Sequence, residues 1–259
     1  MSNVLNVAII QTSLVWENPE ENRRLLKDKI NVIPNDVDLI VLPEMFTSGF
    51  TMHPIKVAET MDGKTITWLK QMAANKNAAI IGSLVIKENN HFYNRLVCVD
   101  SFGNITKYDK RHTFTLAGED KIYTAGTEKI IFKYKGWKIC PLVCYDLRFP
   151  VWSRNTEDYD VLLYVANWPQ SRINAWDALL KARAIENMCY CIGVNRIGKD
   201  EKNNIYCGHS AAYDVFGNLM HELHPNKDYI EYVTLERTHI TRYRNKLKFL
   251  DDKDAFTLM

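Results

Sequence analysis

The pattern of apolar and polar positions predicts alternating strands and helices in the first third of the chain. Three apolar runs have the length and flanking turns of buried strands, and two longer segments between them repeat apolar residues at helical spacing. The strands are predicted at residues 5–11, 37–44 and 78–86, and the helices at residues 18–33 and 64–77. The order is therefore strand, helix, strand, helix, strand.

The first of these helices carries a clear start signal. Asn18 can cap it, Pro19 suits the first helical position, and Glu21 completes a capping box. Leu25, Leu26 and Ile30 then follow at helical spacing.

After residue 92 the pattern changes to strands joined by short glycine-containing turns. Such turns between apolar runs predict hairpins. Hairpins are predicted at residues 92–110, 129–146 and 211–236, and a strand, a helix and a strand at residues 159–168, 174–188 and 189–197. This order fits an α/β fold in which two mixed sheets pack together and are covered outside by helices. No low-complexity linker interrupts the chain, so a single domain over residues 1–259 is expected.

Composition narrows the possible functions. The net charge of +2 gives no field that would favour nucleic acid or a membrane surface, so a small molecule is the expected partner. The N-terminal apolar run is too short to span a bilayer and lacks the features of a secretory signal, which predicts a cytoplasmic protein. The six cysteines follow no disulfide framework and are expected to be free thiols. "HELH" at His221–His224 is the nearest approach to a metal-ligand pair, but it follows a turn and is interpreted as an exposed strand end, so no metal site is predicted.

Two cysteines in "KICPLVCYDLRFP" have different surroundings. Cys140 lies in the middle of the predicted strand and is interpreted as a core residue. Cys144 ends the same strand, where a turn can hold a nucleophile beside backbone N–H groups. Taken alone, a cysteine in such a segment is more often a buried free thiol than a nucleophile.

Two charged residues also stand where strands end. Glu44 follows the apolar run at 37–42 and is either a cap or a carboxylate aimed into a pocket, while Lys110 is either a solvated lysine or part of a site. Together with Cys144 they would supply a base, a positive charge for an oxyanion and a nucleophile.

Four segments, "LPEMFTSGF", "KYDKRHTF", "VCYDLRFP" and "ANWPQSRINAWDALLKARAIEN", resemble in this order the signature segments of the nitrilase superfamily of carbon–nitrogen hydrolases. The resemblance covers nearly the whole chain, and "VCYDLRFPVWSRN" and "VANWPQSR" are most similar to the bacterial omega-amidase branch, which hydrolyses the side-chain amide of 2-oxoglutaramate or 2-oxosuccinamate.

The resemblance implies a four-layer α-β-β-α sandwich that pairs as a homodimer through its inner helices. It implies a catalytic triad of Glu44, Lys110 and Cys144, with Glu119 holding Lys110 and the backbone N–H of Tyr145 helping to bind the oxyanion. It also implies that neither a metal nor an organic cofactor is required.

Substrate choice is predicted from a smaller set of residues. A guanidinium matches the free carboxylate of an omega-amide with two hydrogen bonds, and Arg172 is the candidate. Phe46 and Trp168 are expected to be apolar walls. Arg148 is interpreted as a support beneath the nucleophile turn, paired with a carboxylate, and His209 is expected to alter the rim of the site.

Two other functions fit the same residues. An N-carbamoyl or other aliphatic amide hydrolase would use the same Glu-Lys-Cys triad. An inactive binding or scaffold member of the fold is the remoter alternative, because it would have no reason to keep all three side chains.

Overall fold

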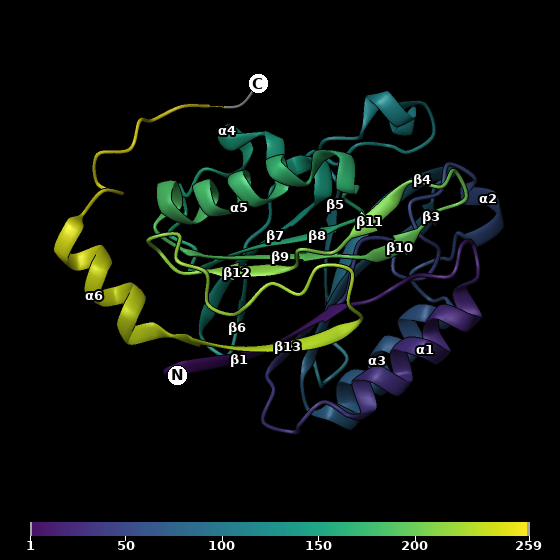
Figure 1. Ribbon diagram of the computed structural model, residues 1–259, viewed down its shortest axis with the longest axis horizontal. Helices are drawn as coiled ribbons and strands as arrows, with labels where there is room; N and C mark the ends of the chain where they lie inside the picture. The colour runs from purple at the N-terminus through teal and green to yellow at the C-terminus, as the bar shows by residue number, and fades with distance from the viewer. Residues whose placement is uncertain (1, 258–259) are drawn as a thin grey trace.

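The computed structural model of the protein describes residues 2–257, which form two mixed β-sheets (Figure 1). The first sheet has six strands in the order β13 (Tyr229–Glu236), β1 (Val4–Gln11), β2 (Leu39–Val41), β3 (Ala79–Glu88), β4 (His91–Val99) and β5 (Ile105–Asp109). The second has five, in the order β12 (Ala211–Tyr213), β9 (Tyr190–Asn195), β8 (Val161–Ala166), β7 (Trp137–Val143) and β6 (Phe132–Tyr134). A separate hairpin joins β10 (Ile197–Lys199) to β11 (Ile205–Cys207).

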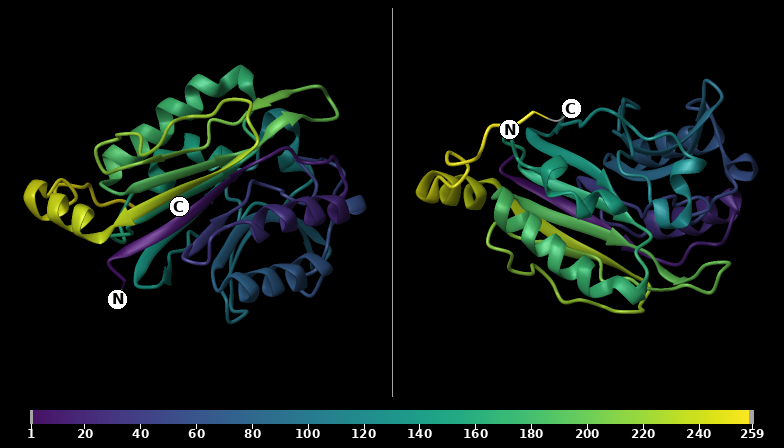
Figure 2. Two further views of the ribbon diagram at one scale, coloured as in Figure 1. Left: turned by 60° about the horizontal axis from the view of Figure 1, so that its bottom comes forward. Right: turned by 90° about the horizontal axis from the view of Figure 1, so that it is seen from above.

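Helices cover the outer faces of both sheets, which confirms the predicted four-layer sandwich. The helices are α1 (Pro19–Asn31), α2 (Pro54–Val57), α3 (Lys64–Lys76), α4 (Pro150–Ser153), α5 (Ile173–Asn187) and α6 (Arg237–Leu247). Helices α1 and α3 lie together against the first sheet, and α5 lies on the far side of the second sheet (Figure 2).

Alternation along the strands builds two cores. Ile40 of β2 and Ile80 of β3 face α1 and α3, whereas their neighbours Val41 and Ile81 belong to a larger cluster that includes residues of both sheets and of α5. Because successive side chains of a strand point to opposite faces, a strand with apolar residues on both faces can sit between two layers. This explains why the predicted strands read as continuous apolar runs.

The start of α1 agrees only in part with the predicted capping box. The Asn18 side chain accepts a hydrogen bond from the Glu21 N–H at 3.1 Å, as predicted. The Glu21 carboxylate does not return the contact but pairs with Arg24 at 2.7 Å, because a residue one turn along the helix offers a charged partner.

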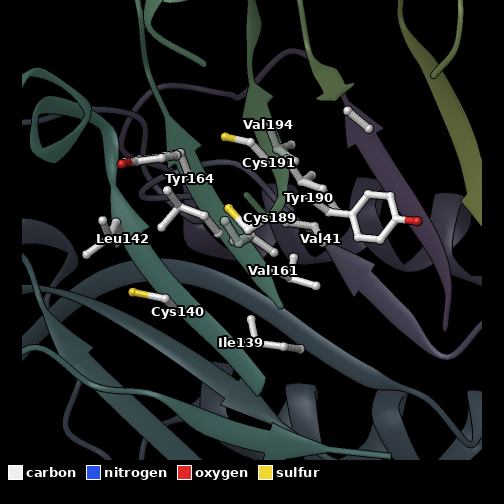
Figure 3. Close-up of a cluster of buried hydrophobic side chains, with 14 of the residues drawn as sticks. Val41, Ile139, Cys140, Leu142, Val161, Tyr164, Cys189, Tyr190, Cys191 and Val194 are labelled. Carbon is white, nitrogen blue, oxygen red and sulfur yellow. The ribbon is translucent and has the colours of Figure 1, made fainter. Parts of the chain in front are cut away.

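Cys140, which the sequence assigned to the core, lies with two other thiols on the face of the second sheet that packs against α5. Cys140, Cys189 and Cys191 lie among Ile139, Leu142 and Val161 of the second sheet (Figure 3). All six cysteines are free, and burial raises the pKa of Cys140 to about 12, which keeps it protonated and unreactive. The prediction that Cys140 fills the core is consistent with this placement.

The last predicted hairpin, at residues 211–236, is wrong. Strand β12 pairs with β9 in the second sheet, whereas β13 pairs with β1 in the first. Residues 221–224 form part of the loop between them instead of a strand end, and His221 accepts a hydrogen bond from the Ala212 N–H at 3.1 Å. A hairpin and a crossover between sheets give the same local pattern of apolar residues and turns.

No helix within residues 2–257 is long and apolar enough to cross a membrane.

Candidate active site

Strand ends from both sheets meet at one edge of the sandwich. Strands β2 and β5 run in the same direction, because β2 pairs parallel with β3 and the antiparallel β4 separates β3 from β5. Strands β7 and β8 also pair parallel to each other. Glu44 follows β2, Lys110 follows β5 and Cys144 follows β7. All three line one cavity of about 380 Å³, so the structure brings the predicted triad together.

Lys110 is held between two buried carboxylates. Its Nζ donates to Glu44 Oε1 at 3.0 Å and to Glu119 Oε2 at 2.9 Å, and all three side chains are at most 1% exposed. This burial rules out a solvated lysine at position 110 and an exposed loop acid at position 119. A buried charge with two opposite partners costs far less than an unpaired one.

The negative charges of Glu44 and Glu119 keep Lys110 protonated. Burial by itself lowers the pKa of the Lys110 ammonium, but Glu119 and Glu44 outweigh burial and hold the pKa above its ordinary value. Burial raises the pKa of the Glu119 carboxyl, and Lys110 opposes that rise. Lys110 therefore carries a permanent positive charge inside the site.

Glu44 is oriented from the opposite sheet. Its Oε2 accepts the backbone N–H of Asn167 at 2.8 Å, and the Asn167 side chain donates to the Glu44 carbonyl oxygen at 2.7 Å. Asn94 donates to Glu44 Oε1 at 2.8 Å. Asn94 and Asn167 were not found from the sequence, since buried amides that only orient an acid leave no spacing pattern.

Cys144 stands at a strained turn. It begins the 3₁₀ helix Cys144–Arg148 with a φ of +45°, a left-handed conformation that non-glycine residues adopt at a cost of about 1 to 3 kcal/mol. Burial raises the pKa of the Cys144 thiol well above its usual value, Glu44 raises it further and Lys110 opposes both. The N–H groups at the start of a helix have no partner within it, and that of Tyr145 is one of them.

Asp146 is a buried carboxylate beneath this turn that sequence analysis also missed. Its Oδ2 accepts the Val143 N–H at 3.0 Å and the Tyr108 hydroxyl at 2.8 Å. Its Oδ1 accepts the His112 N–H at 2.9 Å and lies 2.7 Å from His112 Nδ1. Asp146 thus joins the end of β7, before the nucleophile, to the segment that follows Lys110.

The predicted walls are only partly correct. Trp168 lines the cavity, with its Nε1 donating to the Arg172 carbonyl oxygen at 2.8 Å, and Arg172 lines it too. Phe46 does not: it is fully buried in the core beneath the first sheet, against Gly82, where a Cβ would come within 2.8 Å of its ring. Phe50 supplies the aromatic wall instead, with its ring 5.1 Å from Lys110 Nζ.

Two further expectations are corrected. Arg148 is exposed and lines the cavity without a carboxylate within 4 Å among the residues that the structure describes, and the turn is supported by Arg183, which donates to the Leu147 carbonyl oxygen at 2.6 Å. His209 lies outside the cavity lining: its Nδ1 is 3.0 Å from Asp177 of α5. The sequence could not distinguish Arg148 from Arg183 as the support of the turn, because it shows that both are charged but not which of them is buried.

Over residues 2–257, the one group that could hold a metal ion is Glu17, His53 and Glu201, near the mouth of the cavity. Glu17 already accepts from Thr51 at 2.5 Å and from Lys56 at 2.9 Å, so a cation would have to displace a lysine.

Comparison with known proteins agrees with this fold. The family model for carbon-nitrogen hydrolases matches residues 6–245. The chain therefore belongs to the carbon–nitrogen hydrolase family, as its motifs predicted. It is 40% identical over 257 residues to Omega-amidase YafV of Yersinia enterocolitica, which covers 99% of this chain and 100% of that protein.

Two other proteins extend the comparison. The 2-oxoglutaramate amidase of Bacillus subtilis is 34% identical over 221 residues, covering 83% of this chain and 85% of that protein. The crystal structure of XC1258 from Xanthomonas campestris, a CN-hydrolase superfamily protein with an arsenic adduct in the active site, is 38% identical, covers 100% of both chains and superposes with a TM-score of 0.97.

Proposed function

We propose that the protein is an omega-amidase that hydrolyses the side-chain amide of 2-oxo dicarboxylic acid monoamides, such as 2-oxoglutaramate and 2-oxosuccinamate, to the 2-oxo acid and ammonia. The observation that carries the proposal is Lys110 held between Glu44 and Glu119 in the cavity that also contains Cys144 and Arg172. The names of the relatives in Yersinia and Bacillus support the substrate class.

The first half of the reaction forms a thioester. Because the thiol pKa of Cys144 is high, Glu44 removes the proton as the sulfur attacks the amide carbon. Lys110 and the backbone N–H of Tyr145 stabilise the negative charge that develops on the oxygen. Glu44 then gives its proton to the nitrogen, and ammonia leaves.

The second half releases the acid. Glu44 takes a proton from a water molecule that attacks the thioester, and the proton returns to the Cys144 sulfur as the carbon–sulfur bond breaks. Glu119 holds Lys110 through both halves and helps to position the water. Every step uses a protein group or water, so the reaction needs neither a metal nor an organic cofactor.

Arg172 binds the free carboxylate of the substrate in this proposal, and Trp168 forms the apolar wall beside it. Its guanidinium carbon lies 5.2 Å from the Phe114 ring centre, and no acid within the described part of the chain pairs with it. Arg172→Gln is expected to lower turnover of carboxylate-bearing amides while sparing neutral ones.

The test is a comparison of kcat/KM for 2-oxoglutaramate, N-carbamoyl amino acids and simple aliphatic amides. We expect 2-oxoglutaramate to be the best substrate, and the assignment would be lost if it were the worst. A better N-carbamoyl substrate would favour the related hydrolase that uses the same triad.

Cys144→Ser provides the matched check of the nucleophile. We expect kcat to fall by at least about 1000-fold, because serine is a much weaker nucleophile beside the same base. In the native protein, iodoacetamide should label Cys144 in preference to the five buried cysteines, since Cys144 alone is partly exposed. Unchanged turnover by Cys144→Ser would instead favour a scaffold whose activity lies elsewhere.

We also propose that the enzyme works in the cytoplasm as a homodimer that pairs through helices of the second sheet. Helices α4 and α5 lie on the same side of the molecule (Figure 1), and Val151 of α4 and Ile185 of α5 are 51% and 44% exposed, which supports a covered surface there. Light scattering of the native protein and of Ile185→Lys is the direct measurement, with a dimer expected for the first and a monomer for the second.

A further inference from the structure

The cavity contains a second arginine that faces the substrate space. Arg148 is exposed, lines the cavity and has no carboxylate within 4 Å in residues 2–257. Its guanidinium carbon lies 5.1 Å from the centre of the Trp168 ring. The support of the nucleophile turn belongs to the buried Arg183, so Arg148 has no structural partner that would account for its position.

Arg148 and Arg172 are held in the same way. Each guanidinium lies over an aromatic ring of the cavity wall, Trp168 for Arg148 and Phe114 for Arg172. Such contacts restrict the guanidinium while its N–H groups remain free to donate. Both rings are themselves packed: Trp168 lies against Trp176 with ring centres 5.5 Å apart, and Phe114 lies against Tyr145 with ring centres 4.9 Å apart. The two cations are therefore positioned before any ligand binds.

Within residues 2–257, none of the other charged groups near the cavity forms an ion pair with Arg148 or Arg172. Asp200 is occupied by its own hairpin turn, where it accepts from Tyr206 and Asn204 at 2.9 and 2.8 Å. Glu201 and Lys202, at the tip of the hairpin, are exposed and carry opposite charges. Glu44 and Glu119 outnumber Lys110 by one charge, but both are fully buried, and they accept hydrogen bonds from Lys110 and from amide N–H groups.

We propose that Arg148 is a second substrate-binding residue and that, with Arg172, it recognises the 2-oxo carboxylate end of the amide and rejects a 2-ammonium group. This rests on the proposed function and deepens it. One carboxylate neutralises only one of two guanidinium groups. The remaining positive charge favours an adjacent oxo oxygen, which accepts hydrogen bonds, and repels the ammonium of an amino acid such as glutamine.

The position of Arg148 also relates binding to chemistry. Cys144 and Arg148 are the first and last residues of one 3₁₀ helix. When Arg148 binds the carboxylate end of the substrate, this short helix fixes the distance from that end to the Cys144 sulfur. Binding therefore determines where the amide carbon lies relative to the sulfur. Orientation of this kind raises the rate without new chemistry.

The experiment compares Arg148→Gln with Arg242→Gln. Arg242 is a matched control, because it is an exposed arginine of α6 that lies over a ring, Tyr243, at 5.5 Å and far from the cavity lining. Steady-state kcat/KM is measured for 2-oxoglutaramate, L-glutamine and pentanamide, a neutral amide of the same chain length.

We expect Arg148→Gln to lower kcat/KM for 2-oxoglutaramate by about 10- to 100-fold, the usual effect of losing hydrogen bonds to a charged group. Pentanamide should change by less than about threefold on the same reasoning, since it offers no anion to lose. The preference for 2-oxoglutaramate over glutamine should narrow by at least about tenfold. Arg242→Gln should leave all three values unchanged.

An equal loss for pentanamide would show a structural role, and an unchanged value for 2-oxoglutaramate would reject Arg148 as a binding residue. If the Arg148→Gln protein fails to fold, Arg148→Lys replaces it, and inhibition by 2-oxoglutarate is measured. We expect 2-oxoglutarate to inhibit Arg148→Lys more weakly than the native enzyme. Unchanged inhibition would contradict the proposal. If the native enzyme prefers pentanamide, the proposed omega-amidase function is refuted. This outcome differs from those that would reject only the role of Arg148.

Discussion

Charged groups of both signs act on the Cys144 thiol. Glu44 disfavours the thiolate and Lys110 favours it, while burial disfavours it more than either charge changes it. The resting enzyme therefore holds a thiol at neutral pH, and a reactive sulfur arises only when a substrate lies in place and Glu44 takes the proton. This arrangement limits reaction of Cys144 with other electrophiles.

Glu44→Gln should have opposite effects on the reactivity of the free Cys144 thiol and on amide turnover. Removing the negative charge is expected to lower the pKa of the Cys144 thiol, because the thiolate loses a repulsive neighbour, whereas Lys110→Met should raise it. Yet kcat for Glu44→Gln should fall by about 100- to 10,000-fold, since the base is gone. The pH dependence of iodoacetamide labelling measures the first effect, and amide turnover measures the second. A higher labelling midpoint in Glu44→Gln would contradict the electrostatic account.

Some residues of the site could be located from the sequence, and others could not. The ends of apolar runs located Glu44, Lys110 and Cys144, because strand ends are visible in the local pattern. The same pattern could not choose between Phe46 and Phe50, four positions apart in one loop. Met45 there has a φ of +42°, which turns the chain so that Phe46 enters the core and Phe50 faces the cavity.

At the scale of secondary-structure elements, Asp146 couples the strand that carries the nucleophile to the one that carries the lysine. All four groups around its two oxygens are suited to donate hydrogen bonds, with His112 doing so through Nδ1–H. An asparagine amide has only one oxygen, so its NH₂ group would face two donors and leave two bonds unmade.

Asp146→Asn is therefore expected to lower the free energy of unfolding by about 2 to 4 kcal/mol. It should also lower kcat at least about tenfold, because Cys144 and Lys110 lose their common anchor. Asp100→Asn is the control: that carboxylate accepts two backbone N–H groups in an exposed turn. Urea unfolding and turnover are measured on both variants. An unchanged kcat in the folded Asp146→Asn protein would mean that the anchor does not align the site.

Some helices and most strands could be predicted from the sequence, but the pairing of the last two strands could not. Helices α1, α3 and α5 and most strands were predicted, because periodicity and caps are local. The pairing of β12 and β13 was not, since β12 finds β9 and β13 finds β1 across the molecule. Pairing of this kind depends on which edges remain free after the rest has assembled.

For the whole molecule, the buried thiols predict a loss of stability in alkali. Burial raises the pKa of Cys98 and of Cys140 to about 12, against an ordinary value near 9.0. Between these values the unfolded chain binds fewer protons than the folded one, so the free energy of unfolding falls as pH rises, by about 1.4 kcal/mol per pH unit for each thiol.

Urea unfolding between pH 8 and pH 10.5 measures this slope. Cys140→Ala should be less stable at pH 8 but should show a shallower decline above pH 9, because one titrating group is gone. The same slope in the variant and the native protein would show that other groups account for the alkaline loss.

The pairing of β1 with β13 also has a consequence for synthesis on the ribosome. Val4 lies opposite Glu236, and the two strands lie side by side along the first sheet (Figure 1). A nascent chain emerges in order, so β1 can add β2 early, but its other edge has no partner until residues 229–236 of β13 have been made. During that interval the edge offers open backbone groups to other chains, and chaperone dependence should fall once β13 has been made.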